Sequence, residues 1–130
     1  EMCIRDSLKA LYKLGYDSLA LKAQHRDFGE FLQRGLTTCI ENFISGKDWP
    51  RSVAHAWSAS PAVFLISEVL GVKPVKPGYR EFTVAPKTGE LDFAKGSVPT
   101  PFGPIQVEWR KMPDGGMEIS CSAPPECRRV

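Results

Sequence analysis

The sequence predicts an α+β protein, with helices in its first half and an antiparallel sheet in its second. Between residues 8 and 32, apolar side chains recur every three to four positions, as they do on a helix that buries one face. After Pro77, apolar side chains alternate with polar ones, as on a half-buried strand, most clearly over residues 105–110. One of the 11 prolines lies in the first 60 residues and ten follow, so composition changes with the period.

The first half is predicted to hold three helices. Two lie between residues 8 and 32 and are broken near residues 15–17, and the second could break again at residues 25–29, where Arg26 and Asp27 interrupt the apolar pattern. A third spans residues 62–70. Ser58 or Ser60 can cap its N-terminus, Pro61 lies in its first turn, and Gly71 ends it.

Residues 35–57 are predicted to be a long connection with at most one helical turn, because Gly46, Asp48 and Pro50 interrupt them. Long ordered loops commonly carry a site. Trp49 is expected to pack in a core, Cys39 to fill a small apolar slot, and His25 to be exposed.

The second half is predicted to hold four strands, at residues 79–85, 92–98, 104–111 and 117–122. The Pro-Asp-Gly-Gly run within residues 112–116 predicts a hairpin turn, not a phosphate-binding loop. Four strands rarely close a sandwich, and we expect no terminating element in the last residues. The sequence is therefore expected to be a fragment.

Charge, hydropathy and cysteine content argue against several classes of protein. Seventeen basic and 15 acidic residues give a net charge of +2 and are scattered, which argues against nucleic acid and membrane partners. The most apolar run, residues 62–70, is far shorter than the ~20 residues of a membrane span. Residues 1–10 show no secretory signal, and localisation stays open. The four cysteines fit neither paired zinc spacing nor a disulfide framework, so no metal or cofactor is expected.

Several motifs follow one another along the chain: Gly-Leu-Thr-Thr-Cys-Ile-Glu ending at Glu41, His-Ala-Trp-Ser-Ala-Ser-Pro beginning at His55, then Leu-Gly-Val-Lys-Pro, Pro-Gly-Tyr and Gly-Ser-Val-Pro-Thr-Pro-Phe-Gly. In this order, residues 26–122 resemble the C-terminal end of the bacterial α-L-rhamnosidases of glycoside hydrolase family 78. The resemblance implies closing helices of an (α/α)6 barrel followed by a partial antiparallel β-sandwich. The expected parts are a non-native leader at residues 1–7, barrel helices at residues 8–72 and a truncated sandwich at residues 73–130.

The resemblance also implies site residues. Glu41 would be the general base of an inverting hydrolysis, with the general acid outside this chain. His55 would hydrogen-bond a rhamnose hydroxyl, and Trp57 would pack nearby, against the barrel or the sugar. From the residues alone, Glu41 could be a solvated surface residue, His55 a satisfied core histidine, and Thr37 or Thr38 the cap of a following turn.

The expected function is hydrolysis of terminal α-L-rhamnosyl groups from a glycoside or polysaccharide. It would need the missing N-terminal part of the same chain, and the 130 residues alone are expected to be inactive and to expose apolar helix faces. One alternative is a non-catalytic carbohydrate-binding module that uses Trp109, Phe102 and Tyr79, although Trp109 shares its face with inward residues. Another is a barrel glycosidase with a different sugar.

Overall fold

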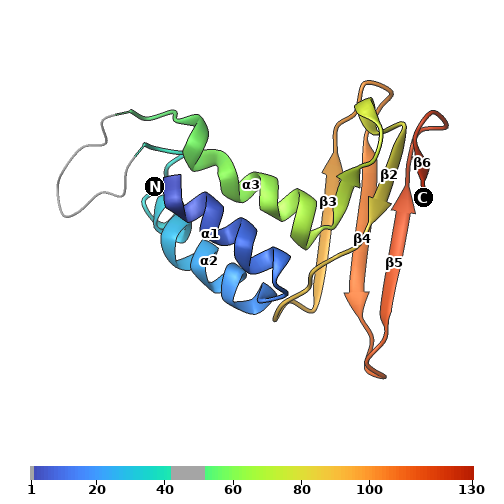
Figure 1. Ribbon diagram of the computed structural model, residues 1–130, viewed down its shortest axis with the longest axis horizontal. Helices are drawn as coiled ribbons and strands as arrows, with labels where there is room; N and C mark the ends of the chain where they lie inside the picture. Colours follow the sequence, from blue (N-terminus) through green and yellow to red (C-terminus); the bar gives the residue numbers. More distant parts are fainter. Residues whose placement is uncertain (1, 42–51) are drawn as a thin grey trace. The chain divides into compact units, whose positions relative to one another are not determined.

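A computed structural model describes residues 2–41 and 52–130 of this chain. It divides into two compact units, Glu1–Phe64, whose regular elements are helices where described, and Leu65–Val130, whose regular elements are mostly strands (Figure 1). This confirms the predicted α+β class and the change from helix to strand along the chain. Within the described residues, the structure contains no helix with the length and apolar content needed to span a membrane.

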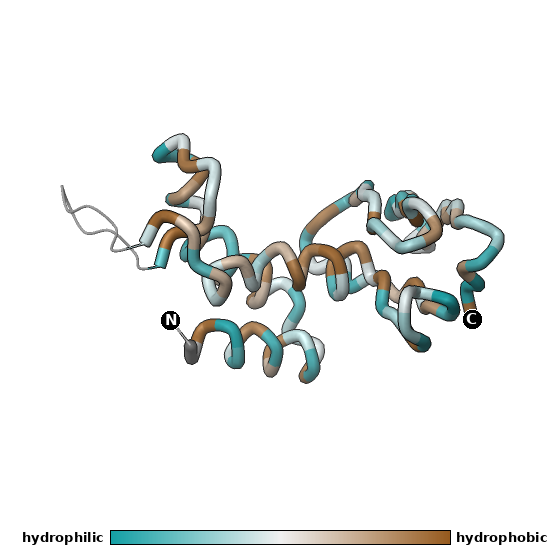
Figure 2. Tube along the Cα trace, turned by 90° about the horizontal axis from the view of Figure 1, so that it is seen from above, coloured by the Kyte–Doolittle hydropathy of each residue, from teal (hydrophilic) through white to brown (hydrophobic). Residues whose placement is uncertain are grey.

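The first two helices form an antiparallel pair joined by a tight turn. Helix α1 spans Met2–Lys13 and α2 spans Asp17–Gln33. The Tyr12 hydroxyl of α1 donates to Gln24 Oε1 of α2 at 2.7 Å, and both side chains are buried. In Figure 2 apolar and polar positions alternate along these helices, as the sequence pattern predicts.

Two details of this pair differ from expectation. Helix α2 is continuous through residues 25–29, where a break was considered possible, because Arg26 is paired with Asp27 and does not interrupt the backbone. Helix α1 begins at Met2, so residues 2–7 are helical, although the sequence predicts a helix only from residue 8. That these residues are a non-native leader stays a prediction.

The third helical segment is composite. A 3-10 turn, η1 (Ala56–Ala59), leads into α3 (Ser60–Phe64) and then into a π-helical turn, η2 (Leu65–Val69). The residue at the cap position of η1 is His55, without a side-chain cap. Helix α3 begins at Ser60, and the serine cap of this helix stays a prediction. Gly71 ends the segment as predicted, with a φ of +82° that favours glycine.

In the part of the chain that the structure describes, six strands form two three-stranded sheets, most of whose strands Figure 1 labels. The first sheet contains β1 (Val72–Pro74), β2 (Glu81–Val84) and β6 (Arg128–Arg129), where β1 is antiparallel and β6 parallel to β2. The second contains β3 (Phe93–Val98), β4 (Ile105–Lys111) and β5 (Met117–Ser122), all antiparallel. A 3-10 turn, η3 (Pro77–Tyr79), connects β1 to β2 where a longer strand was expected.

The two sheets share one hydrophobic core. It joins Val72, Phe82 and Val84 of the first sheet with Val98, Ile105 and Val107 of the second. Trp109 is fully buried, and its indole N–H donates to the Val69 carbonyl at 2.9 Å. The core makes the strand-rich unit a small two-layer sandwich.

The two hairpins of the second sheet use the residues of the sequence motifs. At the β3–β4 turn, the Thr100 hydroxyl donates to the Gly103 carbonyl at 2.6 Å and accepts from the Phe102 N–H at 3.1 Å. At the β4–β5 turn, the Met112 N–H donates to the Gly116 carbonyl at 2.9 Å, and Asp114 Oδ1 accepts from the Gly116 N–H. The predicted Pro-Asp-Gly-Gly hairpin is therefore confirmed.

Candidate functional site

The predicted site residues Glu41 and His55 lie on two chain segments that run side by side. The His55 N–H donates to the Cys39 carbonyl at 2.8 Å, and the Glu41 N–H donates to the Ser52 carbonyl at 2.9 Å. We call residues 38–41 and 52–55 the site stem. Glu41 and His55 are 14 positions apart in the sequence, and the stem places them on two backbone segments joined by hydrogen bonds. Trp49, which was expected to pack in a core, lies outside the described residues, as do Gly46, Asp48 and Pro50.

Side chains reinforce the stem. The Thr38 hydroxyl donates to the Val53 carbonyl, and the Ser52 hydroxyl donates to the Ala54 carbonyl at 3.1 Å. Ile40, between Cys39 and Glu41, is 1% exposed, so its burial holds the segment that carries Glu41 in place. Thr38 therefore holds the two segments together.

The stem begins directly after α2. Gly35 has a φ of +69°, its N–H donates to the Leu32 carbonyl at 3.0 Å, and the Leu36 N–H donates to the Phe31 carbonyl at 2.9 Å. This pattern of paired backbone bonds around a left-handed glycine ends a helix and turns the chain sharply away. The end of α2 thus fixes where residues 38–41 start.

Glu41 has a partly exposed side chain at the end of the stem. No hydrogen bond or ion pair joins its carboxylate to another of the residues that the structure describes. An ionised carboxylate can only accept hydrogen bonds, so this group can accept one from water or from a sugar hydroxyl.

His55 has a buried ring nitrogen without a partner. Its backbone is extended, with φ −132° and ψ 120°, and its carbonyl accepts from the Ser58 N–H at 3.2 Å. Its Nδ1 is buried and makes no hydrogen bond to any residue in the described ranges 2–41 and 52–130. Buried polar atoms nearly always have a partner, so an unpaired one marks a place where a polar group from outside would be favoured. This argues against the interpretation of His55 as a satisfied core histidine.

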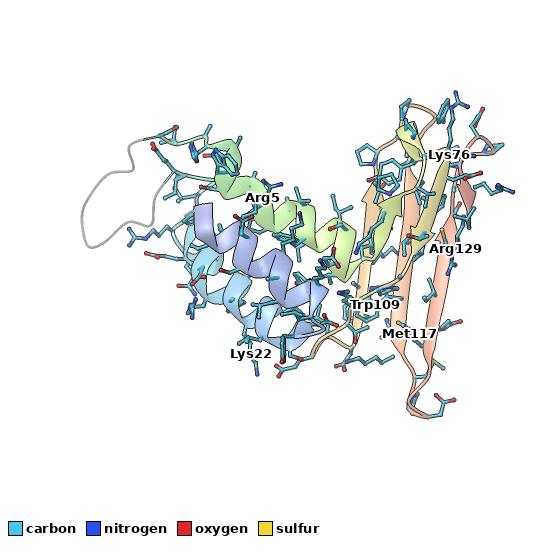
Figure 3. The ribbon with its side chains drawn as sticks, viewed as in Figure 1. Arg5, Lys22, Lys76, Trp109, Met117 and Arg129 are labelled. Atoms are coloured by element: carbon cyan, nitrogen blue, oxygen red, sulfur yellow. The ribbon has the colours of Figure 1, made fainter. Side chains whose placement is uncertain are left out.

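Trp57 lies two residues further on, in η1, and is 49% exposed. The guanidinium of Arg5, which Figure 3 labels on α1, lies 5.5 Å from the centroid of the Trp57 ring, a cation–π arrangement. Trp57 is therefore a surface aromatic side chain, unlike Trp109 in the sandwich core.

Sequence reasoning missed two contributors to this region, Thr38 as a tie across the stem and Arg5 as the partner of Trp57. The partner of Thr38 is 15 residues away, and that of Arg5 is 52 residues away, so no local pattern signals either contact.

Cysteines and metal ligands add no further chemistry in the described residues. Cys39, Cys121 and Cys127 are free thiols, and burial raises the pKa of Cys121, which makes that thiol less reactive. Within residues 2–41 and 52–130, no group of three or more His, Cys, Asp or Glu side chains is placed to hold a metal ion.

Comparison with known proteins relates the chain to glycoside hydrolases. Residues 71–129 match the family described as bacterial alpha-L-rhamnosidase C-terminal domain. The resemblance of the chain to the C-terminal end of the family 78 rhamnosidases is therefore confirmed. The matched residues coincide with the sandwich that starts at β1.

Two curated relatives carry the name alpha-L-rhamnosidase. The protein from Alteromonas sp. is 44% identical over 57 residues, which cover 43% of this chain and 6% of the relative. The protein from Streptomyces avermitilis is 26% identical over 130 residues, which cover 91% of this chain and 12% of the relative. This chain therefore spans only a small part of the length of either protein.

Solved structures match both units. The family 78 rhamnosidase of Bacillus sp. GL1 aligns with a TM-score of 0.80 and 35% identity, covering 97% of this chain and 14% of that protein. The Streptomyces avermitilis alpha-L-rhamnosidase, solved with L-rhamnose, aligns with a TM-score of 0.76 and 23% identity, covering 94% and 13%. The second match shows the fold alone.

Proposed function

We propose that this chain is the C-terminal part of an inverting α-L-rhamnosidase, with Glu41 as the general base. The site stem is the observation that supports the proposal, because it pairs the segment of Glu41 with the segment of His55, whose buried Nδ1 has no partner among the described residues. The match of 97% of the chain to a family 78 rhamnosidase supports the same assignment. The proposed substrate is a terminal α-L-rhamnosyl group on a glycoside or polysaccharide.

In the proposed reaction, the Glu41 carboxylate accepts a proton from the water that attacks C1 of the sugar. A carboxylic acid from a part of the enzyme outside these 130 residues protonates the leaving oxygen. Inverting glycosidases hold two such groups roughly 6.5–9.5 Å apart, which leaves room for the water. The 130 residues supply one of the two groups, so we expect them to be inactive alone.

His55 and Trp57 would bind the sugar. The imidazole can exchange a hydrogen bond with a rhamnose hydroxyl, which would satisfy the buried Nδ1. The exposed half of the Trp57 ring can pack against the apolar C–H face of the sugar or against another part of the enzyme.

We further propose that the helices close an (α/α)6 barrel formed with other helices of a longer chain. In the described part of the helical unit, six large hydrophobic side chains are more than half exposed: Leu14, Tyr16, Leu19, Leu32, Val53 and Val63. Such residues are buried in most helical proteins, and neighbouring barrel helices would cover them.

Replacement of Glu41 tests the proposal. In the longer protein encoded by the same reading frame, Glu41→Gln should reduce kcat on p-nitrophenyl α-L-rhamnoside by ~10³-fold or more, with little change in sugar binding. Gln keeps the shape of the side chain but cannot accept the proton. The matched control, Glu126→Gln, changes an exposed carboxylate in the sandwich and should leave kcat within about twofold.

A fully active Glu41→Gln variant would show that Glu41 is not the base. If the wild-type enzyme cleaves a different p-nitrophenyl glycoside and no rhamnoside, the stem belongs to a barrel glycosidase of another specificity. The carbohydrate-binding alternative on Trp109, Phe102 and Tyr79 is not favoured. Trp109 is fully buried, and the other two pack against the sandwich core.

A further inference from the structure

The outer face of the second sheet is a polar surface with a shallow hollow. Its side chains come from alternate residues of all three strands, and the register places Lys95, Glu108 and Ser120 in one row and Ser97, Gln106 and Ser122 in the next. These six residues line the hollow. We call this surface the outer β3–β5 face. It lies wholly within the strand-rich unit.

Most hydrogen-bonding groups of this face are not used within the protein. The hydroxyls of Ser97, Ser120 and Ser122 and the amide of Gln106 have no side-chain hydrogen bond to the part of the chain that the structure describes. A hydroxyl is both donor and acceptor, and an amide offers both on separate atoms. The face therefore presents donors and acceptors on a rigid sheet with fixed strand spacing, about 4.8 Å between neighbouring strands.

The charges of the hollow neutralise each other. Lys95 Nζ and Glu108 Oε2 are 3.0 Å apart across β3 and β4, and both side chains are substantially exposed. A charged ligand would compete with this pair, whereas a neutral polar ligand can bond to its remaining donors and acceptors. The chemistry favours an uncharged, hydroxyl-rich molecule.

An aromatic ring borders the same face. Phe93 precedes Lys95 by two residues on β3, so it points to the same side, and it is 54% exposed. The Arg110 guanidinium, on the paired position of β4, lies 5.1 Å from its ring centroid. A partly exposed aromatic ring beside free polar groups matches a saccharide, which has apolar C–H faces and hydroxyl edges.

The acid on the outer side of the first sheet has more cationic partners. There Glu81 is bound by Lys76 at 2.9 Å and by Arg128 at 2.6 Å, whereas Glu108 of the outer β3–β5 face pairs with Lys95 at 3.0 Å.

From these observations we propose that the outer β3–β5 face binds a neutral saccharide chain. Its hydroxyls would bond Ser97, Gln106, Ser120 and Ser122, and one sugar ring would pack on Phe93. This function goes beyond the proposed hydrolysis, since it holds sugar without cleaving it and uses none of Glu41, His55 and Trp57. It would keep a polymeric substrate close to the enzyme, as a second binding module does.

A titration of the ¹⁵N-labelled 130-residue chain tests the proposal, with maltohexaose, a rhamnan oligosaccharide and oligogalacturonate as probes. We expect one of the two neutral oligosaccharides to shift backbone and side-chain amide resonances of residues 93–97, 106–110 and 118–122, saturating at about 1 mM. The variant Gln106→Ala/Ser122→Ala should weaken this binding at least tenfold, and Phe93→Ala should weaken it severalfold. Thr83→Ala, on the first sheet, is the matched control and should bind as the wild type does.

Three results would overturn the proposal: no shifts on this face up to about 10 mM of either neutral probe, equal binding by the Gln106→Ala/Ser122→Ala variant, or tighter binding of the anionic oligogalacturonate. None of them bears on Glu41, because the altered residues belong to the other unit. Failure of saccharide binding and failure of the proposed hydrolysis are therefore separate outcomes.

Discussion

The helical unit and the strand-rich unit satisfy their apolar and polar groups to different extents. In the sandwich, Trp109 and Phe82 are fully buried, and the indole N–H has a carbonyl partner. In the helical unit, Leu14 and Leu32 are 70% and 78% exposed, and the His55 Nδ1 is buried without a partner. The sandwich completes its own core, whereas the helices keep surfaces and atoms that other groups can complete. The proposed catalytic residues lie in the less complete unit.

The two tryptophans provide the largest expected contrast. Trp109→Ala should destabilise the sandwich by about 3–5 kcal/mol, because it leaves a large cavity and removes the donor to the Val69 carbonyl. Trp57→Ala should cost less than about 1 kcal/mol, mainly the cation–π contact with Arg5. Chemical denaturation of both variants measures the difference. Similar losses at the two positions would contradict the assignment of Trp57 to the surface.

Two glycines with nearly the same backbone angle sharpen the comparison. Gly71 in the sandwich unit has φ +82°, and Gly15 in the helical unit has φ +81°. Alanine at either position meets the same left-handed strain, about 1–2 kcal/mol. At Gly71 its Cβ would also lie 2.4 Å from the Ala85 carbonyl carbon, whereas no atom lies within 4 Å at Gly15. We therefore expect Gly71→Ala to lower Tm clearly more than Gly15→Ala, and equal shifts would refute the close contact.

The smallest expected effect concerns an ion-pair cluster of the sandwich. Hydrogen bonds from Lys76 and then from Arg128 hold the pKa of Glu81 below its usual range. A carboxylate with a lower pKa in the folded state adds stability above its unfolded pKa, about 4.3, and this stability is lost as pH falls through the folded pKa. Below pH ~4.3 the wild type should thus approach Glu81→Gln in stability. Thermal melts at several pH values measure this, and a constant difference between the two would contradict the cluster's role.

The fold was predictable where a period extends over many residues. Residues 8–32 and 105–110 show clear helical and strand periods, and the structure has helices and a strand there. Strands β1 and β6 were missed because three and two residues are too short to show a period. The π-helical turn at Leu65–Val69 was also missed, because its i to i+5 bond, from the Leu70 N–H to the Leu65 carbonyl, changes no residue type.

The candidate site was less predictable. Nothing in residue spacing alone pairs the segment of Glu41 with the segment of His55, and only the family resemblance suggests that both belong to one site. The structure adds the hydrogen bonds that form the stem, such as that from the Thr38 hydroxyl to the Val53 carbonyl. These bonds join residues 15 positions apart, so they depend on the path of the chain between them. Long-range backbone pairing of this kind has no signature in the local sequence.

Parallel pairing of β6 with β2 has a consequence for biosynthesis. The Arg128 and Glu81 side chains are 47 positions apart, and the Val130 N–H donates to the Phe82 carbonyl at 2.9 Å. A ribosome makes β2 long before β6, while the β3–β5 meander between them can form from neighbouring residues. Until residues 128–130 emerge, one edge of β2 has unpaired backbone groups of the kind that recruit foreign strands. Premature termination just before Arg128 would therefore leave a nearly complete sandwich with an open, aggregation-prone edge.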